Sequence, residues 1–255
     1  GLGDVYKRQE YAIRPTGTQQ PADMDGQILV PFAVESSLSG VMKTLGKENE
    51  LWYSREFTVP SSWKGKNILL HFGAVDWQAD VWVNGVKMGQ HRGGYTPFSF
   101  DITPVLAKGK NQITVKVWDP SDEGYQPRGK QVKHPDGIWY TPVSGIWQTV
   151  WMEPVSANHI TRLKTTPDID KKILTVEAHT ATGNPSAVVS VVVSEGGKVV
   201  ATGKAMQGQP VQLAIENARL WSPENPFLYD MKVTLTDNGK VIDEVNSYAA
   251  MRKYS

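Results

Sequence analysis

The sequence predicts an all-β protein built from two consecutive β-sandwich domains. Apolar and polar residues alternate with a period of two through most of the chain, as expected for strands that bury one face. Helical periodicity is hard to find anywhere in the sequence. The composition also changes after Pro154, because eight of the nine Trp residues lie at or before Trp151.

The part of the chain before Pro154 contains several stretches with the pattern of strands. Asn84-Gly85, between residues 80–83 and 86–89, is the residue pair that favours a two-residue hairpin turn. Long strands joined by long loops are typical of a large jelly-roll sandwich. The apolar residues that alternate are Leu51, Tyr53, Phe57 and Val59, then Ile68, Leu70 and Phe72, then Ile113, Val115 and Val117, and finally Val150 and Met152.

The part after Pro154 is predicted to form an immunoglobulin-like sandwich. Gly196-Gly197 and Asn238-Gly239 supply two hairpin turns. Seven short alternating strands within one domain suit this architecture. The expected strands are residues 160–166, 172–180, 187–194, 198–205, 210–216, 227–236 and 240–247.

The domain boundaries follow from these patterns. We expect an N-terminal extension at residues 1–27, a jelly-roll domain at 28–156, an immunoglobulin-like domain at 157–247 and a linker at 248–255. Residues 1–9 match no predicted element, and part of this extension is expected not to be native.

Composition excludes several functional classes. The formal net charge of +1 and the lack of a basic cluster argue against nucleic-acid binding. The absence of Cys excludes disulfides, thiolate metal sites and Cys nucleophiles. No apolar run approaches the length of a membrane span. The five His residues have no metal-ligand spacing, so we expect no metal and no cofactor.

Five stretches carry a more specific signal: WYSREFTVP at 52–60, FGAVDW at 72–77 with VWVNG at 81–85, GGYTPFSFDI at 93–102, SGIWQTVW at 144–151 and LWSPENPFLY at 220–229. In this order they resemble the sugar-binding domain (a galactose-binding-like jelly roll) and the immunoglobulin-like domain of family 2 glycoside hydrolases. Residues 247–253 look like the segment that leads into that family's catalytic barrel.

The resemblance implies a parent enzyme that hydrolyses terminal β-glycosides with retention, similar to β-galactosidases or β-glucuronidases. The expected partners are the parent's catalytic barrel and a carbohydrate that the chain alone binds weakly. The resemblance favours a periplasmic or extracellular location, which the residues themselves do not decide.

Retaining glycosidases need two closely spaced carboxyl groups. In the family both are Glu residues on barrel strands, the acid preceded by Asn. Asn49-Glu50 is the one Asn-Glu pair here, and we expect it to lie in a solvated, charged loop. We therefore predict no catalytic residue in this chain, and no activity for the chain alone.

The candidate sugar-binding residues lie mainly in a long loop, residues 119–141, which mixes carboxylates with aromatic rings. The resemblance brings Asp136 near the family's substrate-contacting Asp and Asn49 near its substrate-contacting Asn. In the competing interpretation, Trp139 and Arg128 only pack against the barrel or the sandwich edge. We expect Trp52, Trp82, Trp118, Trp147 and Trp151 to be structural. The candidate set is Asn49, Trp77, Asp136, Trp139 and Tyr140.

Two other functions fit the same residues. One is a free-standing carbohydrate-binding module, and the other is a purely structural interaction module. If a barrel is the partner, Trp139, Tyr140 and residues 249–254 are expected to edge an exposed apolar patch.

Overall fold

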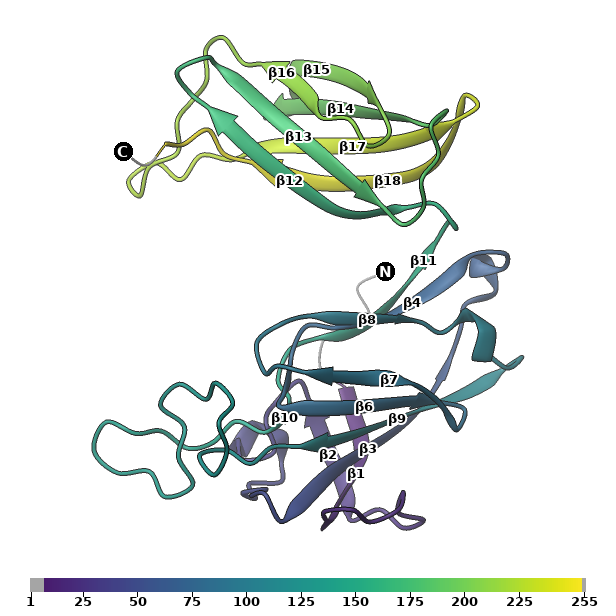
Figure 1. Ribbon diagram of the computed structural model, residues 1–255, viewed down its shortest axis with the longest axis vertical. Coiled ribbons are helices and arrows are strands. Elements are labelled where there is room, and N and C mark those ends of the chain that lie inside the picture. The colour runs from purple at the N-terminus through teal and green to yellow at the C-terminus, as the bar shows by residue number, and fades with distance from the viewer. Residues whose placement is uncertain (1–6, 254–255) are drawn as a thin grey trace. The chain divides into compact units, whose positions relative to one another are not determined.

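The computed structural model describes residues 7–253 and divides the chain into two compact units, Gly1–Pro154 and Val155–Ser255 (Figure 1). Antiparallel strands make up both units, and the only helices among the described residues are three short 3₁₀ turns. The all-β prediction is confirmed. No helix in the described part of the chain is long and apolar enough to cross a membrane.

The first unit is a sandwich whose larger sheet has six strands in the order β2-β1-β3-β9-β6-β7. A three-stranded sheet, β11-β4-β8, and a two-stranded sheet, β10-β5, complete it. The strands are β1 (Lys7–Pro15), β2 (Gly26–Val30), β3 (Asn49–Thr58), β4 (Asn67–Phe72), β5 (Val75–Asp76), β6 (Gln78–Val83), β7 (Val86–Arg92), β8 (Phe98–Asp101), β9 (Lys110–Trp118), β10 (Gly145–Ile146) and β11 (Val150–Val155). The 3₁₀ turns are η1 (Ser37–Ser39), η2 (Ser61–Trp63) and η3 (Thr103–Val105).

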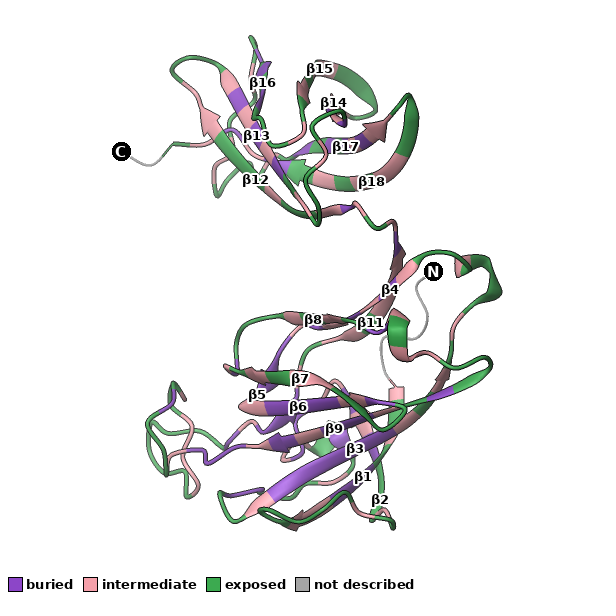
Figure 2. Cartoon of the chain, turned by 45° about the vertical axis from the view of Figure 1, so that its right-hand side comes forward, coloured by how far each residue is buried: buried purple, intermediate pink, exposed green. Residues whose placement is uncertain are grey.

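Sequence alternation explains the first core. Ile68, Leu70 and Phe72 on β4 are buried, and the residues between them are partly exposed. Figure 2 shows buried residues concentrated in β3, β6 and β9, the central strands of the larger sheet. Asn84 and Gly85 both have positive φ, as the predicted β6–β7 hairpin turn requires.

The second unit contains all seven strands that the sequence predicts. Three form the sheet β12-β13-β16 and four form the sheet β15-β14-β17-β18. Val191 and Val233 at its centre are fully buried. The strands are β12 (Ile160–Asp168), β13 (Ile173–Thr180), β14 (Val188–Glu195), β15 (Lys198–Met206), β16 (Val211–Ala214), β17 (Tyr229–Asp237) and β18 (Lys240–Ala249).

Residues 7–9, for which the sequence pattern predicts no element, begin β1. They pair with β2, and β1 also pairs with β3 from Glu10 onward. Neighbouring strands supply the hydrogen-bond partners, and the sequence pattern of this stretch does not reveal them. Residues 1–6 lie outside the described part of the chain.

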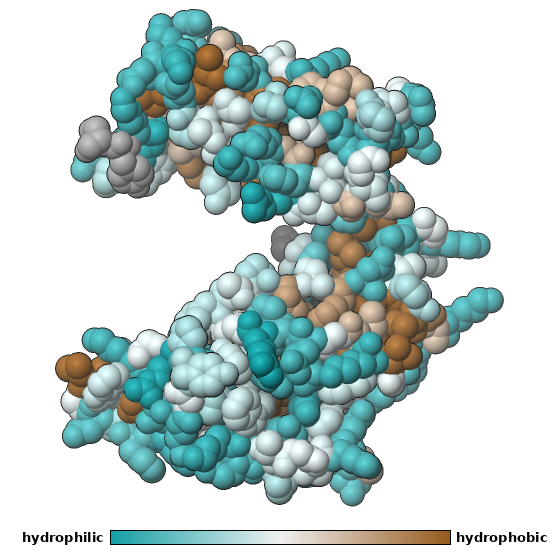
Figure 3. Space-filling view, viewed as in Figure 1, coloured by the Kyte–Doolittle hydropathy of each residue, from teal (hydrophilic) through white to brown (hydrophobic). Residues whose placement is uncertain are grey.

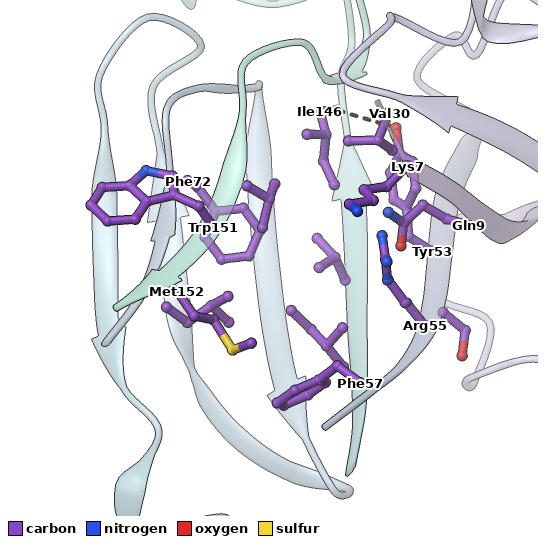
Figure 4. Close-up of a pocket in the computed structure, with 15 residues that line it drawn as sticks. Lys7, Gln9, Val30, Tyr53, Arg55, Phe57, Phe72, Ile146, Trp151 and Met152 are labelled. Carbon is purple, nitrogen blue, oxygen red and sulfur yellow. Dashed lines mark hydrogen bonds between the residues drawn. The ribbon is translucent and has the colours of Figure 1, made fainter. Parts of the chain in front are cut away.

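A cavity of about 190 Å³ opens beside this strand, between the two larger sheets of the first unit. Figure 4 shows Lys7, Gln9 and Arg55 along one side and Phe72 and Met152 along the other. Most of the wall is apolar, so Lys7 and Gln9 stand where a sandwich normally places large apolar side chains. We interpret the cavity as a gap in the core.

The expected apolar patch at residues 249–254 needs a correction. Ala249 and Met251 are 2% and 0% exposed and belong to the core of the second unit. Met251 pairs with Leu220 in an isolated bridge, which carries this segment inward. Tyr254 lies outside the described residues.

Candidate functional site

The chain between β9 and β10, residues 119–144, is called here the long loop. Its two ends are fastened together at the base of the sandwich. The Ser144 hydroxyl donates to Asp119 Oδ2 at 2.7 Å, and the Ser121 amide donates to Asp119 Oδ1 at 2.8 Å. The Ser144 amide donates to Glu35 Oε2 at 2.9 Å. Asp119, Ser121 and Ser144 are all buried, so the base of the loop is part of the unit's interior.

Gln131 fastens the middle of the long loop. Its Nε2 lies 3.3 Å from Asp76 Oδ2 and 3.3 Å from the Tyr95 hydroxyl, and its Oε1 accepts from the Val143 amide at 2.5 Å. Asp76 is 3% exposed and ends β5. Gly94 packs so closely on the Asp76 carboxyl that any Cβ there would overlap it.

Glu35, Asp76 and Asp119 are called here the acid cluster. Burial raises the pKa of Asp76 to about 7, and the charges of Asp119 and Glu35 add to the shift. Burial also raises the pKa of Glu35 to about 7, against the hydrogen bonds from Ser144. Burial likewise raises the pKa of Asp119. In each case desolvation disfavours the charged form more than the local hydrogen bonds favour it.

The outer half of the long loop carries three of the predicted sugar-binding residues. Gln131 and Tyr140 form an isolated bridge, and Tyr140 donates its amide to the Lys130 carbonyl. Arg128 lies over the Trp139 ring at 6.0 Å, and Lys130 lies over Tyr140 at 5.8 Å. Trp139 is 42% exposed and Tyr140 64%. Asp136 is exposed and accepts from the Gly137 amide.

Apolar side chains also reach solvent at this end of the first unit. Figure 3 shows apolar surface at the outer end of the long loop. Ile138 is 66% exposed there, beside Trp139. A cluster of exposed aromatic and aliphatic groups on a tethered loop is characteristic of a contact surface for a ligand or a partner.

Asn49 begins β3 directly after a turn at residues 45–48, called here the Asn49 turn, which adjoins the long loop. Its side-chain amide donates to the Leu45 carbonyl at 2.9 Å, so part of its hydrogen-bonding capacity serves the turn itself. The Lys47 ammonium lies 2.8 Å from Glu123 of the long loop. Lys133 of the loop lies 3.7 Å from Glu48 and 3.4 Å from Glu123. These ion pairs bring the turn and the loop together.

Trp77 belongs to the same end of the sandwich. Its ring packs edge-on against Trp118 at 6.3 Å, and Arg92 lies over it at 5.8 Å. The Trp118 indole donates to the Lys47 carbonyl at 2.9 Å. Contacts therefore link Trp77, the Asn49 turn and the long loop, whereas Asp136 and Trp139 stand farther out on that loop.

The remaining first-unit Trp residues differ in their surroundings. Trp52 is 3% exposed and stacks on Trp82 at 5.8 Å. The Trp147 indole donates to the Gly94 carbonyl at 2.8 Å. Trp151 is 47% exposed and stacks on His71 at 4.1 Å. Trp151 therefore differs from the others in presenting a large part of its ring to solvent.

The structure contradicts the expectation that Asn49 and Glu50 lie in a solvated loop. Asn49 and Glu50 both belong to β3, and Glu50 is 4% exposed, with Oε1 3.2 Å from the Lys116 ammonium. The strand continues two residues farther than its apolar pattern indicates, because β1 pairs with it up to Asn49. Among residues 7–253, no group of three or more His, Cys, Asp or Glu side chains is arranged to hold a metal ion.

Comparison with known families decides which group of proteins this chain belongs to. Residues 30–153 match the model of the sugar binding domain of glycosyl hydrolases family 2. Residues 158–252 match a second model of glycosyl hydrolases family 2. The chain belongs to glycosyl hydrolase family 2. The resemblance that the sequence motifs indicate is confirmed.

Curated relatives within family 2 are longer proteins. A β-glucuronidase of Paenibacillus borealis is 30% identical over 244 residues, which are 89% of this chain and 40% of the relative. A β-galactosidase of Thermoanaerobacter pseudethanolicus is 32% identical over 213 residues, 79% of this chain and 28% of the relative. The chain thus spans well under half the length of these family 2 relatives.

Solved structures agree on the fold of this family 2 chain. A β-glucuronidase from Ruminococcus gnavus, in complex with D-glucaro 1,5-lactone, aligns with a TM-score of 0.74 at 24% identity. The alignment covers 99% of this chain and 46% of that one. A β-glycosidase from Bacteroides vulgatus aligns with a TM-score of 0.71 at 23% identity.

The acid cluster is the part of the site that sequence reasoning missed. None of Glu35, Asp76, Asp119 and Gln131 is in the candidate set that the sequence predicts, although Asp119 and Gln131 lie within the loop at 119–141. One usable signal was present: Asp76 and Asp119 each stand at the end of an apolar strand segment, where a carboxylate is unusual unless it has a partner.

Proposed function

We propose that this chain is a non-catalytic sugar-binding and scaffold region of a longer family 2 glycoside hydrolase. The observation that supports it best is the long loop, tethered beside Trp77 and the Asn49 turn and carrying exposed Asp136, Trp139 and Tyr140. Aromatic faces bind the apolar face of a pyranose, and carboxylates accept its hydroxyl groups.

In this proposal the two sandwich units brace a catalytic barrel, and the long loop closes one side of its substrate pocket. The named relatives are β-glucuronidases and β-galactosidases, which supports a parent that hydrolyses terminal β-glycosides. A loop that supplies only one wall encloses little of a monosaccharide, so affinity without the barrel is expected to be millimolar or weaker. That corresponds to roughly 4 kcal/mol or less of binding free energy.

A free-standing carbohydrate-binding module is the second candidate. The exposed rings of Trp139 and Tyr140 favour it, because such modules bind glycans on solvent-facing aromatic side chains. A module of this kind holds an oligosaccharide at micromolar concentration without a second domain.

Titration calorimetry against a panel of β-linked oligosaccharides separates the two candidates. We expect no binding below the millimolar range, and no hydrolysis of nitrophenyl glycosides above background. Micromolar binding that is lost in Trp139→Ala but kept in Tyr125→Ala, a 96% exposed ring on the same loop, favours the module. Turnover that disappears in Glu50→Gln would contradict the scaffold proposal.

A further inference from the structure

Besides the ion pairs of Lys47 with Glu123 and of Lys133 with Glu48, the long loop is held at its base by carboxyl groups that have no counter-ion. Among the residues that the structure describes, none of Glu35, Asp76 and Asp119 forms an ion pair. Their hydrogen-bond donors are neutral: the Ser121 and Ser144 amides, the Ser144 hydroxyl and the Gln131 side chain. Glu35 Oε1 is buried and accepts no hydrogen bond.

Other buried carboxylates of the same unit are neutralised. Asp80, also 3% exposed, has Lys87 at 2.7 Å and Lys116 at 3.8 Å. Although burial opposes it, the hydrogen bonds from Lys87 and Gln90 hold the pKa of Asp80 below its usual range. Glu50 has Lys116 at 3.2 Å. The acid cluster therefore differs from its surroundings in having several carboxyls and no cation.

We propose that Glu35, Asp76 and Asp119 form a proton-controlled latch, which holds the long loop on the sandwich when protonated and releases it as the cluster ionises. Glu35 lies in the connection between β2 and η1 and Asp76 ends β5, whereas Asp119 begins the long loop. Repulsion among the three ionised groups therefore separates the loop from its base. Regulation of sugar binding by this latch rests on the function proposed above, but the latch itself does not.

The direction of the pH effect follows from proton linkage. When the loop is in place, the pKa values of Glu35 and Asp76 are about 7, above their ordinary values of 4.5 and 3.8. A released, hydrated cluster returns toward the ordinary values, so the closed form binds more protons between about pH 4.5 and 7. The ratio of released to closed loop rises by up to about tenfold per pH unit for each proton lost, and levels off above pH 7.

The groups that face the cluster do not reverse this direction. From β3, Tyr53 is buried near Glu35, and burial raises its pKa, so it stays neutral throughout the range. Beyond Gln131 lies the Tyr95 hydroxyl, from the turn between β7 and β8. Gly94 contributes only its backbone. No Lys, Arg or His in the described part of the chain contributes to the pKa of the three carboxyls.

The absence of Cys allows a direct test of loop mobility. Tyr125→Cys places one thiol at a 96% exposed position of the long loop, and Val86→Cys places a matched one on the β6–β7 hairpin, 50% exposed. Each protein is spin-labelled, and label mobility is recorded from pH 4.5 to 9 with no sugar present. We expect mobility at position 125 to rise up to about pH 7, while mobility at position 86 stays constant.

Two variants assign the effect to the cluster. Glu35→Gln combined with Asp76→Asn keeps the side-chain shapes and removes two charges, so the label at position 125 should stay immobile across the whole range. Asp136→Asn, on the exposed part of the same loop, should leave the pH profile of the parent protein unchanged. Gln131→Ala should mobilise the label even at pH 5, because it removes the middle attachment.

Three results would overturn the proposal. The first is a flat mobility profile at position 125. The second is a profile that the double variant leaves unchanged. The third is full immobilisation at pH 8 by millimolar Ca²⁺, which would make the cluster a cation site instead. Because no sugar is used, each result is independent of whether the loop binds carbohydrate.

Discussion

All of the buried polar and charged side chains among residues 7–253 belong to the first unit, with the exception of His159. The second unit has an interior mostly of Val, Leu, Ala and Met residues, together with the buried ring of Tyr229. The longest connection between consecutive strands also differs. In the first unit it is the long loop, residues 119–144, whereas in the second it is the shorter connection from β16 to β17, residues 215–228.

This difference bears on the roles proposed above for the two units. A long loop can keep a defined position only if its backbone and side chains find partners in the sandwich. The first unit supplies them through Glu35, Asp76 and Asp119. Burial of these carboxyl groups is unfavourable when they are ionised. The second unit fastens its shorter connection, residues 215–228, without a buried carboxyl group: the Arg219 amide donates to the Tyr229 hydroxyl and the Trp221 amide donates to the Met251 carbonyl. Under the proposed function, the first unit, which carries the long loop, is the one that faces the ligand, and the second unit is the brace.

The largest expected difference between the units is their response to pH. The first unit should lose stability as the pH rises from about 4.5 to 7. In this range Glu35 and Asp76 are still protonated in the folded state, whereas the same groups in the unfolded chain have already ionised. The rise in the pKa of Asp76 from 3.8 to about 7 corresponds to a loss of about 4 kcal/mol at most from the free energy of unfolding.

The measurement is urea unfolding at pH 5 and pH 8, followed by Trp fluorescence. Eight of the nine Trp residues lie in the first unit and Trp221 lies in the second, so a Trp221→Phe variant isolates the first unit's signal. If the first unit is equally stable at both pH values, the prediction that its buried carboxyl groups make it more sensitive to pH than the second unit is wrong.

A second test of the difference between the two units replaces one glycine in each unit by alanine. A Cβ at Gly145 would overlap the Tyr53 hydroxyl, and Gly145 has a φ of +92°. Gly145→Ala should therefore destabilise the first unit by about 3 kcal/mol through combined overlap and backbone strain. Gly183→Ala in the second unit meets nothing within 4 Å and should be close to neutral. Thermal unfolding of both variants gives the comparison, and equal effects would contradict it.

A third, smaller effect should stabilise the first unit. Gln9→Leu places an apolar side chain in the cavity beside Phe72 and Met152, and should add about 1–2 kcal/mol to the free energy of unfolding. Glu10→Leu, on the exposed face of the same strand, is the matched control and should add nothing. If both variants behave alike, the cavity is not a packing defect.

The smallest effect is expected at the outer end of the long loop. Trp139→Ala should change the free energy of unfolding by less than about 0.5 kcal/mol, because Trp139 is 42% exposed and belongs to neither core. Val191→Ala at the centre of the second unit should cost about 2 kcal/mol by comparison. A large loss in Trp139→Ala would favour the interpretation in which Trp139 packs as a structural residue.

Local pattern was sufficient for much of the fold. The seven strands of the second unit follow from alternation and from turns such as Asn238-Gly239, because burial of one sheet face imposes a period of two on the sequence. The first residues of β1 were not predictable in this way. Lys7 and Gln9 have no strand-like apolar pattern, and pairing with β2 imposes their extended conformation.

The sequence by itself determined the fold class, the family and the aromatic, carboxylate-bearing character of the long loop, since each depends on residues close together in the chain. Only the tertiary structure decided that Glu35, Asp76, Asp119 and Ser144 meet beneath that loop. These residues come from separate connections and strand ends, and no local pattern records which of them become neighbours. Burial then sets their proton affinity, because desolvation of a carboxylate depends on everything packed around it.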